Sequence, residues 1–173
     1  MLEVRINVPE NQNYGGIVAA YKKGEFVYIS GTWTPAQVAD LNMGQAEAGH
    51  ERLTRCTGGA LNIPGMVFPI DKHVYTEADS DSDYNTLTAG DLVIRYGPGN
   101  RLATDCYQSD ISGGTALGTK LYVNTTGWLS LSGHAAGEGS PIAVLVSTET
   151  VGTTNYFNGT PLYSKDLIVY DLL

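Results

Sequence analysis

The sequence predicts a mainly β protein: a compact antiparallel β-sandwich or barrel with one short helix and an N-terminal arm that can extend from it. The first observation is the composition, because the 173 residues include 21 Gly and 11 Tyr but only 16% charged residues. Glycine supplies turns, and aromatic and β-branched residues favour strands. The second is spacing, since strand-like runs recur about every 8–12 residues with turn signals between them. The length fits one domain.

The N-terminal segment 2–8 alternates apolar and polar residues, which predicts a half-buried strand that ends at Pro9. The polar stretch 10–16 is interpreted as a linker. We therefore divide the chain into an N-terminal strand or arm with its linker, residues 1–14, and a single β-rich domain, residues 15–173. Two alternatives stay open, because the strand can pair within its own domain or reach a neighbouring molecule.

A short helix over about 35–42 follows a predicted strand at 24–33. Thr34 suits the N-cap, Pro35 suits the first helical position, and Gln37 stands at the spacing of a capping box. Gly44 is expected to end the helix. Residues 45–65 are interpreted as a mixed connection.

The remaining strands are predicted from β-rich runs between glycine turns. The run 66–75 contains Pro69, which indicates an edge strand or a bend. Further strands are expected at about 91–96, 103–107, 119–124, 127–131 and 141–148, with a last one in 165–173. The segments 23–31, 89–97 and 117–127 share one form, in which a glycine and a polar residue lead into a β-rich run that ends in a glycine turn. This form predicts hairpins rather than ligand-binding loops.

Residues that carry chemistry do not form a known motif in this sequence. Asp79, Asp81 and Asp83 have the spacing of the start of a calcium loop, but Tyr84 and Gly90 stand where Gly and Glu are needed. We expect a solvated acidic loop there. The three histidines fit no catalytic or metal-binding pattern and lie far apart, at His50, His73 and His134. We predict no catalytic, cofactor-binding or metal-binding residue, and no enzyme activity.

The charge and the cysteine content indicate which classes of partner and which cellular compartment to expect. The net charge of −8, with only 10 Lys and Arg, argues against direct nucleic-acid binding. Cys56 and Cys106 form no CxxC pair and are interpreted as free thiols of a reducing cytosol. The sequence shows no basic-then-apolar signal region and no apolar run of membrane-spanning length, so we expect synthesis in the cytoplasm and no membrane contact.

Three segments resemble small β-proteins on the heads of tailed bacteriophages, the capsid decoration (cement or head-stabilising) proteins. They are "AGDLVIRYG" at 89–97, "LYVNTTGWLSL" at 121–131 and "GSPIAVLVST" at 139–148, within a resemblance that covers about 86–148. The resemblance implies a non-enzymatic virion structural protein that binds the outer capsid surface. It would stabilise the shell by bridging major capsid protein subunits, as a homo-oligomer with a trimer favoured over a dimer.

The resemblance also implies a candidate interface, because an N-terminal arm often makes the bridging contacts in such proteins. An alternating strand can add to an exposed sheet edge on a neighbour. The predicted interface residues are Leu2, Val4, Arg5, Ile6, Val8 and Trp33.

Two alternatives stay open for the function. One is a carbohydrate- or receptor-binding β-module of a head fibre or spike, which an exposed Trp33 or Trp128 beside Asn or Asp would favour. The other is a tail-tube or head–tail joining protein, which would assemble into stacked rings.

Overall fold

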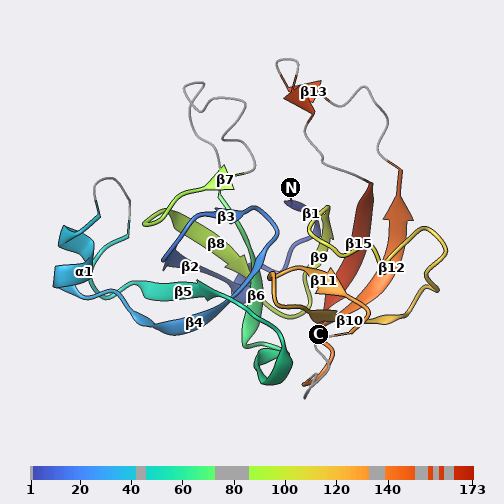
Figure 1. Ribbon diagram of the computed structural model, residues 1–173, viewed down its shortest axis with the longest axis horizontal. Helices are drawn as coiled ribbons and strands as arrows, with labels where there is room; N and C mark the ends of the chain where they lie inside the picture. Colours follow the sequence, from blue (N-terminus) through green and yellow to red (C-terminus); the bar gives the residue numbers. More distant parts are fainter. Residues whose placement is uncertain are drawn as a thin grey trace.

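The mainly β fold predicted from the sequence is confirmed by the computed structural model, in which a closed barrel packs against a six-stranded sheet (Figure 1). The structure describes residues 2–41, 46–72, 86–132, 139–150, 156–157, 160–161 and 166–173. In order around the barrel, the strands are β2 (Gln12–Ile17), β5 (Glu51–Arg55), β4 (Phe26–Thr32), β6 (Val67–Asp71) and β8 (Leu92–Tyr96). Across the sheet they are β1 (Leu2–Ile6), β9 (Arg101–Thr104), β15 (Leu167–Leu172), β12 (Ala143–Glu149), β10 (Lys120–Val123) and β11 (Leu129–Ser130).

Short elements connect and cover these two layers. Two pairs of short strands form separate ribbons, β3 (Tyr21–Lys22) with β7 (Thr86–Leu87), and β13 (Tyr156–Phe157) with β14 (Thr160–Pro161). The helical segments are the 3₁₀ turns η1 (Pro9–Asn11) and η2 (Gly59–Leu61) and the helix α1 (Pro35–Ala39). Pairing is antiparallel throughout the described ladders except between β2 and β5, which are parallel and close the barrel.

The barrel interior is filled by one buried side chain from each of its strands. These are Ile17, Val27, Leu53, Ile70 and Val93. The β3–β7 ribbon adds two more apolar side chains to this cluster, because Tyr21 and Leu87 pair across it and both are buried. A small barrel filled by side chains leaves no central channel.

The larger core lies between the outer wall of the barrel and one face of the sheet. The barrel contributes Phe26, Val67, Ile94 and Tyr96, and the sheet contributes residues from all six strands, including Leu2, Leu102, Leu121, Leu129, Leu145 and Tyr170. The Phe26 and Tyr170 rings meet across this boundary, with their centroids 6.1 Å apart. The barrel and the sheet therefore share one core, as two packed layers do in a single domain.

The N-terminal strand pairs within its own chain, which is one of the two alternatives left open by the sequence. β1 lies antiparallel to β9 at one edge of the sheet, with Leu2 opposite Thr104. A register shift between Val4 and Ile6 interrupts the expected alternation, because a bulge adds one unpaired residue, Arg5. The alternating strand therefore buries Leu2 but leaves Val4 and Ile6 exposed.

The structure differs from the sequence interpretation at residues 10–16 and at Pro69. The predicted linker is not a linker, because η1 follows β1 directly and β2 enters the barrel at Gln12. The boundary after residue 14 therefore falls inside a barrel strand. The run containing Pro69 was predicted to be an edge strand or a bend, and the first alternative is wrong, since β6 pairs with β4 on one side and β8 on the other. The β6–β8 ladder uses only Ile70 and Asp71, so the missing Pro69 N–H removes none of its bonds.

The predicted helix is confirmed, together with its capping box. The Thr34 N–H donates to Gln37 Oε1 at 3.0 Å, and the Gln37 N–H donates to Thr34 Oγ1 at 3.3 Å. The helix ends at Ala39, before the predicted residue 42. Gly44, the expected stop, lies outside the described residues.

Both cysteines are free, as the sequence led us to expect, and both are buried. Burial raises the pKa of the Cys106 thiol from its usual 9.0 to about 11. The folded chain therefore holds this proton more tightly than the unfolded chain, and the resulting stability is lost as the pH rises from 9.0 through about 11.

We expect a thiol reagent such as Ellman's to label neither Cys56 nor Cys106 in the folded chain at neutral pH, and to label both in urea. We also expect the free energy of unfolding, measured with urea, to fall as the pH rises above 9.0. Rapid labelling of the folded chain at neutral pH would contradict the buried environment of the thiols.

Candidate partner-binding surfaces

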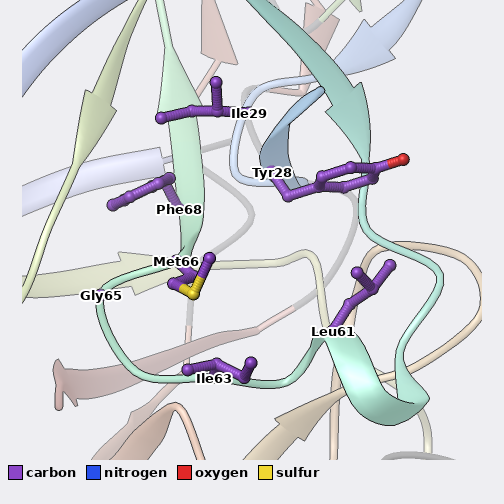
Figure 2. Close-up of a pocket in the computed structure, with 7 residues that line it drawn as sticks. All are labelled: Tyr28, Ile29, Leu61, Ile63, Gly65, Met66 and Phe68. Carbon is purple, nitrogen blue, oxygen red and sulfur yellow. The ribbon is translucent and has the colours of Figure 1, made fainter. Parts of the chain in front are cut away.

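A shallow apolar hollow lies beside the barrel, where β4 and β6 meet the loop after η2 (Figure 2). Its volume is about 200 Å³. The barrel hollow, as we call it, is lined by Tyr28, Ile29, Leu61, Ile63, Gly65, Met66 and Phe68. None of the lining residues carries a charge, so the hollow is suited to an apolar group.

A tight turn builds one side of the barrel hollow. The Met66 N–H donates to the Ile63 carbonyl at 3.0 Å, and Gly65 has a φ of 75°. Pro64 before a glycine of positive φ is the signature of a type II turn. Figure 2 shows Met66 between Phe68 and Ile63, with Tyr28 and Leu61 on the opposite side of the opening.

Buried Asn62 fixes this turn to the sheet. Its side-chain amide donates to the Val123 carbonyl at 3.0 Å, and its Oδ1 accepts from the Val123 N–H at 2.9 Å. Asn62 and Val123 are both fully buried. The turn is therefore held to β10, so the position of the barrel hollow depends on the packing of the barrel against the sheet.

The exposure of the lining residues makes the barrel hollow a candidate interface. Met66 is 59% exposed, Ile63 43% and Ile29 40%, whereas Phe68 is buried beneath them. Neighbouring exposed apolar side chains are uncommon on a soluble surface and often mark a binding site. Methionine adapts its shape easily, which suits a contact surface.

The second candidate surface is the edge strand β1. Among the described strands, β1 pairs only with β9, so its other side presents unpaired backbone groups. Val4 and Ile6 are 38% and 49% exposed. Arg5 Nη2 lies 2.8 Å from Glu3 Oε2 and 2.6 Å from Glu149 Oε2.

Five of the six predicted interface residues fall into two groups. Val4, Arg5 and Ile6 lie together on the β1 edge. Leu2 and Trp33 are instead packed in the chain's own interior, since Leu2 joins the shared core and the Trp33 Nε1–H donates to the Gly16 carbonyl at 3.0 Å. Both side chains were predicted as interface residues, and in this structure both are buried.

The sixth predicted interface residue is Val8. The barrel hollow, in contrast, was not among the predicted sites. The Val8 N–H donates to Asn100 Oδ1 at 2.9 Å, which holds the residues between β1 and η1 to the turn before β9. Sequence reasoning missed the barrel hollow. The available signal was the pair of large apolar residues, Ile63 and Met66, on either side of a Pro-Gly turn that is more often polar.

Several ionisable side chains in the described part of the chain form ion pairs within the fold. Glu25 pairs with Arg55 at 2.8 Å, and Glu51 Oε2 lies 2.6 Å from Arg95 Nε. Within these described ranges, no group of three or more His, Cys, Asp or Glu side chains could hold a metal ion. The acidic segment around Asp79, Asp81 and Asp83, and also His73 and His134, lie outside the described residues.

Trp128, the second tryptophan, is half-buried beside charged groups. Its Nε1–H donates to Glu25 Oε1 at 3.1 Å, and Lys22 Nζ lies 5.3 Å from its ring centroid. A lysine over the ring occupies a face that a sugar would need for stacking.

Two comparisons with known proteins supply no site residues for this chain. No protein-family model matches it, and no curated protein matches it. None of the helices in the described ranges is long and apolar enough to span a membrane. A functional proposal therefore depends on the fold, the two apolar surfaces and the sequence resemblance.

Proposed function

We propose that the chain is a non-enzymatic virion structural protein that binds the outer surface of a phage capsid and bridges subunits of the major capsid protein. The observation that carries the proposal is the barrel hollow, which combines exposed apolar side chains with a turn that Asn62 bonds to β10. The phage-head resemblance of the segments within 86–148 supports the class of protein.

Bridging two capsid subunits needs more than one contact surface. The barrel hollow lies on the barrel between β4 and β6, whereas the β1 edge belongs to the six-stranded sheet. An apolar side chain of the capsid protein would enter the barrel hollow, and self-association would link neighbouring copies over the shell. In this proposal the protein is made in the cytoplasm of the host bacterium and ends on the virion surface, with no contact to nucleic acid or membrane.

The carbohydrate-binding alternative receives no support from the two tryptophans. It called for an exposed tryptophan beside Asn or Asp, but Trp33 is only 6% exposed and Trp128 is half-buried under Lys22. The capsid proposal needs neither ring to be free, because neither tryptophan lines the barrel hollow.

Met66→Asp is expected to weaken binding to capsids of the same genome by about tenfold or more, since docking would bury an unpaired carboxylate. Binding is measured by co-sedimentation of the purified chain with capsids. The fold should be unaffected, because the Met66 side chain is 59% exposed.

Leu117→Asp is the matched control for Met66→Asp. Leu117 is 69% exposed, lies in the connection before β10 and is not among the residues that line the barrel hollow. We expect this variant to bind like the unaltered chain. Undiminished binding by Met66→Asp, or an equal loss in both variants, would contradict the assignment of the barrel hollow.

A further inference from the structure

We propose that the β1 edge is a self-association surface, on which β1 of a second copy pairs antiparallel about Val4 to form a two-fold dimer. This inference goes beyond the proposed function, because it depends only on β1 and would hold whatever the barrel hollow binds. It also favours a dimer over the trimer expected from the resemblance, since antiparallel pairing of identical edges uses the same surface on both copies.

The edge is available for pairing. On the side away from β9, no strand in the described part of the chain pairs with β1. An unpaired strand edge offers a row of N–H and C=O groups to another strand. Val4 and Ile6, which are 38% and 49% exposed there, would lose water-accessible apolar surface on pairing.

The charge pattern of β1 identifies the second copy as the occupant. The strand reads Leu-Glu-Val-Arg-Ile, so opposite charges flank Val4 at equal spacing. In an antiparallel pair centred on Val4, Glu3 lies opposite Arg5 of the second copy, and Arg5 lies opposite its Glu3. Leu2 lies opposite Ile6 at both ends. Opposite charges placed directly across an antiparallel pair attract.

The same charges disfavour other pairings. A parallel, in-register pair would place Glu3 opposite Glu3 and Arg5 opposite Arg5, and like charges in this position repel. A strand without a matching charge would leave Glu3 or Arg5 facing an uncharged neighbour. Charges on an edge strand therefore act against general aggregation while permitting pairing with a copy of the same sequence.

The bulge in β1 is compatible with this pairing. Arg5 is the residue left without a counterpart on β9, and its guanidinium already contacts Glu3 at 2.8 Å. In the dimer this contact would pass to Glu3 of the second copy. Because the strand has only five residues, we expect an association that depends on protein concentration.

Charge reversal tests the proposal by analytical ultracentrifugation. The unaltered chain is expected to shift from monomer to dimer as its concentration rises. Glu3→Arg and Arg5→Glu should each remain monomeric, because each variant carries two like charges on β1. An equal mixture of the two variants should form dimers again, since every arginine then faces a glutamate.

Arg5→Glu also removes the contact with Glu149, so Glu149→Gln serves as the control and should dimerise like the unaltered chain. The proposal is overturned if the unaltered chain stays monomeric at every concentration, if the single variants dimerise as it does, or if their mixture stays monomeric.

Cross-linking gives a second readout that does not depend on charge. Val4 would lie opposite Val4, with Cβ atoms about 4.5–5.5 Å apart, which is close to disulfide geometry. Val4→Cys should therefore form a disulfide-linked dimer under mild oxidation. Ile6→Cys should not, because the two Ile6 positions would be about 13 Å apart along the strands. The native thiols of Cys56 and Cys106 are buried and should not take part. Equal cross-linking of both variants, or of neither, would overturn the proposed register.

Discussion

Replacing Asn62 with alanine is expected to lower the free energy of unfolding by about 2–5 kcal/mol, one of the two largest effects that we predict for a single substitution. The substitution removes a donor and an acceptor at once, so the Val123 carbonyl and N–H both lose the Asn62 side-chain partner. Asn62 and Val123 are fully buried, so water does not replace the lost bonds. A buried polar group without a partner costs about 1–3 kcal/mol.

Urea unfolding followed by tryptophan fluorescence measures this loss. Asn11→Ala is the matched control, because the exposed Asn11 side chain also donates to a carbonyl, that of Pro98. We expect the control to change stability by less than about 1 kcal/mol. Asn62→Asp should also destabilise the fold, since a carboxylate can accept from the Val123 N–H but would face the Val123 carbonyl. Similar stability of Asn62→Ala and Asn11→Ala would contradict this account of how the turn is fixed.

Gly139→Ala is the second substitution with a large expected effect, about 2–5 kcal/mol. Gly139 has a φ of 69°, a conformation that costs an L-residue about 1–2 kcal/mol. A Cβ atom there would also lie 2.6 Å from the Asn62 carbonyl oxygen and 2.8 Å from the Gly59 carbonyl oxygen. Both oxygens belong to the backbone of the η2 turn, so relief requires that turn to shift, and overpacking of this kind costs about 1–3 kcal/mol.

Gly118→Ala is the control that separates the conformational cost of a positive φ from the cost of the steric clash. Gly118 has a φ of 82°, but a Cβ atom there would meet nothing within 4 Å. It should therefore show only the conformational cost of about 1–2 kcal/mol. The difference between the two variants, measured by urea unfolding, reports the clash at Gly139. Equal losses of unfolding free energy in Gly139→Ala and Gly118→Ala would contradict the clash, because they would show that the backbone at η2 moves without cost.

The local features of the fold could be predicted because they depend on neighbouring residues. The leading glycines of the three recurrent segments, Gly24, Gly90 and Gly118, all have a positive φ, between 82° and 91°. Each of them precedes the strand that the segment predicted: β4, β8 and β10 respectively. The helix α1 was similarly predictable, since its capping box lies within four residues.

Sequence reasoning missed β2 and β5, because their residue patterns depend on contacts with distant parts of the chain. Gly15 and Gly16 were interpreted as part of a linker, but a Cβ atom on Gly16 would lie 2.4 Å from Trp33 Nε1, and one on Gly15 would lie 2.8 Å from Leu53 Cδ1. These glycines allow β2 to pack closely in the barrel, and nothing in the neighbouring sequence reveals that. β5 was missed because only Leu53 of its five residues is fully buried.

The candidate surfaces were only partly predictable, because they too depend on contacts between residues distant in the sequence. The apolar residues of β1 were visible in the sequence, but the bulge that exposes Ile6 and the pairing that buries Leu2 depend on β9. The barrel hollow joins residues of β4 with a turn more than thirty positions later, from Tyr28 to Met66. Whether these apolar residues remain exposed to solvent depends on how the whole chain packs.

The proposal that this chain is a structural protein of the capsid exterior is tested most directly by electron cryomicroscopy. Capsids assembled from the major capsid protein of the same genome would be imaged with and without the purified chain. We predict additional density on the outer surface, repeated with the capsid lattice, with the barrel hollow against the shell. Capsids that remain bare at saturating concentration of the chain would contradict the proposal, as would assembly of the chain into stacked rings away from the shell.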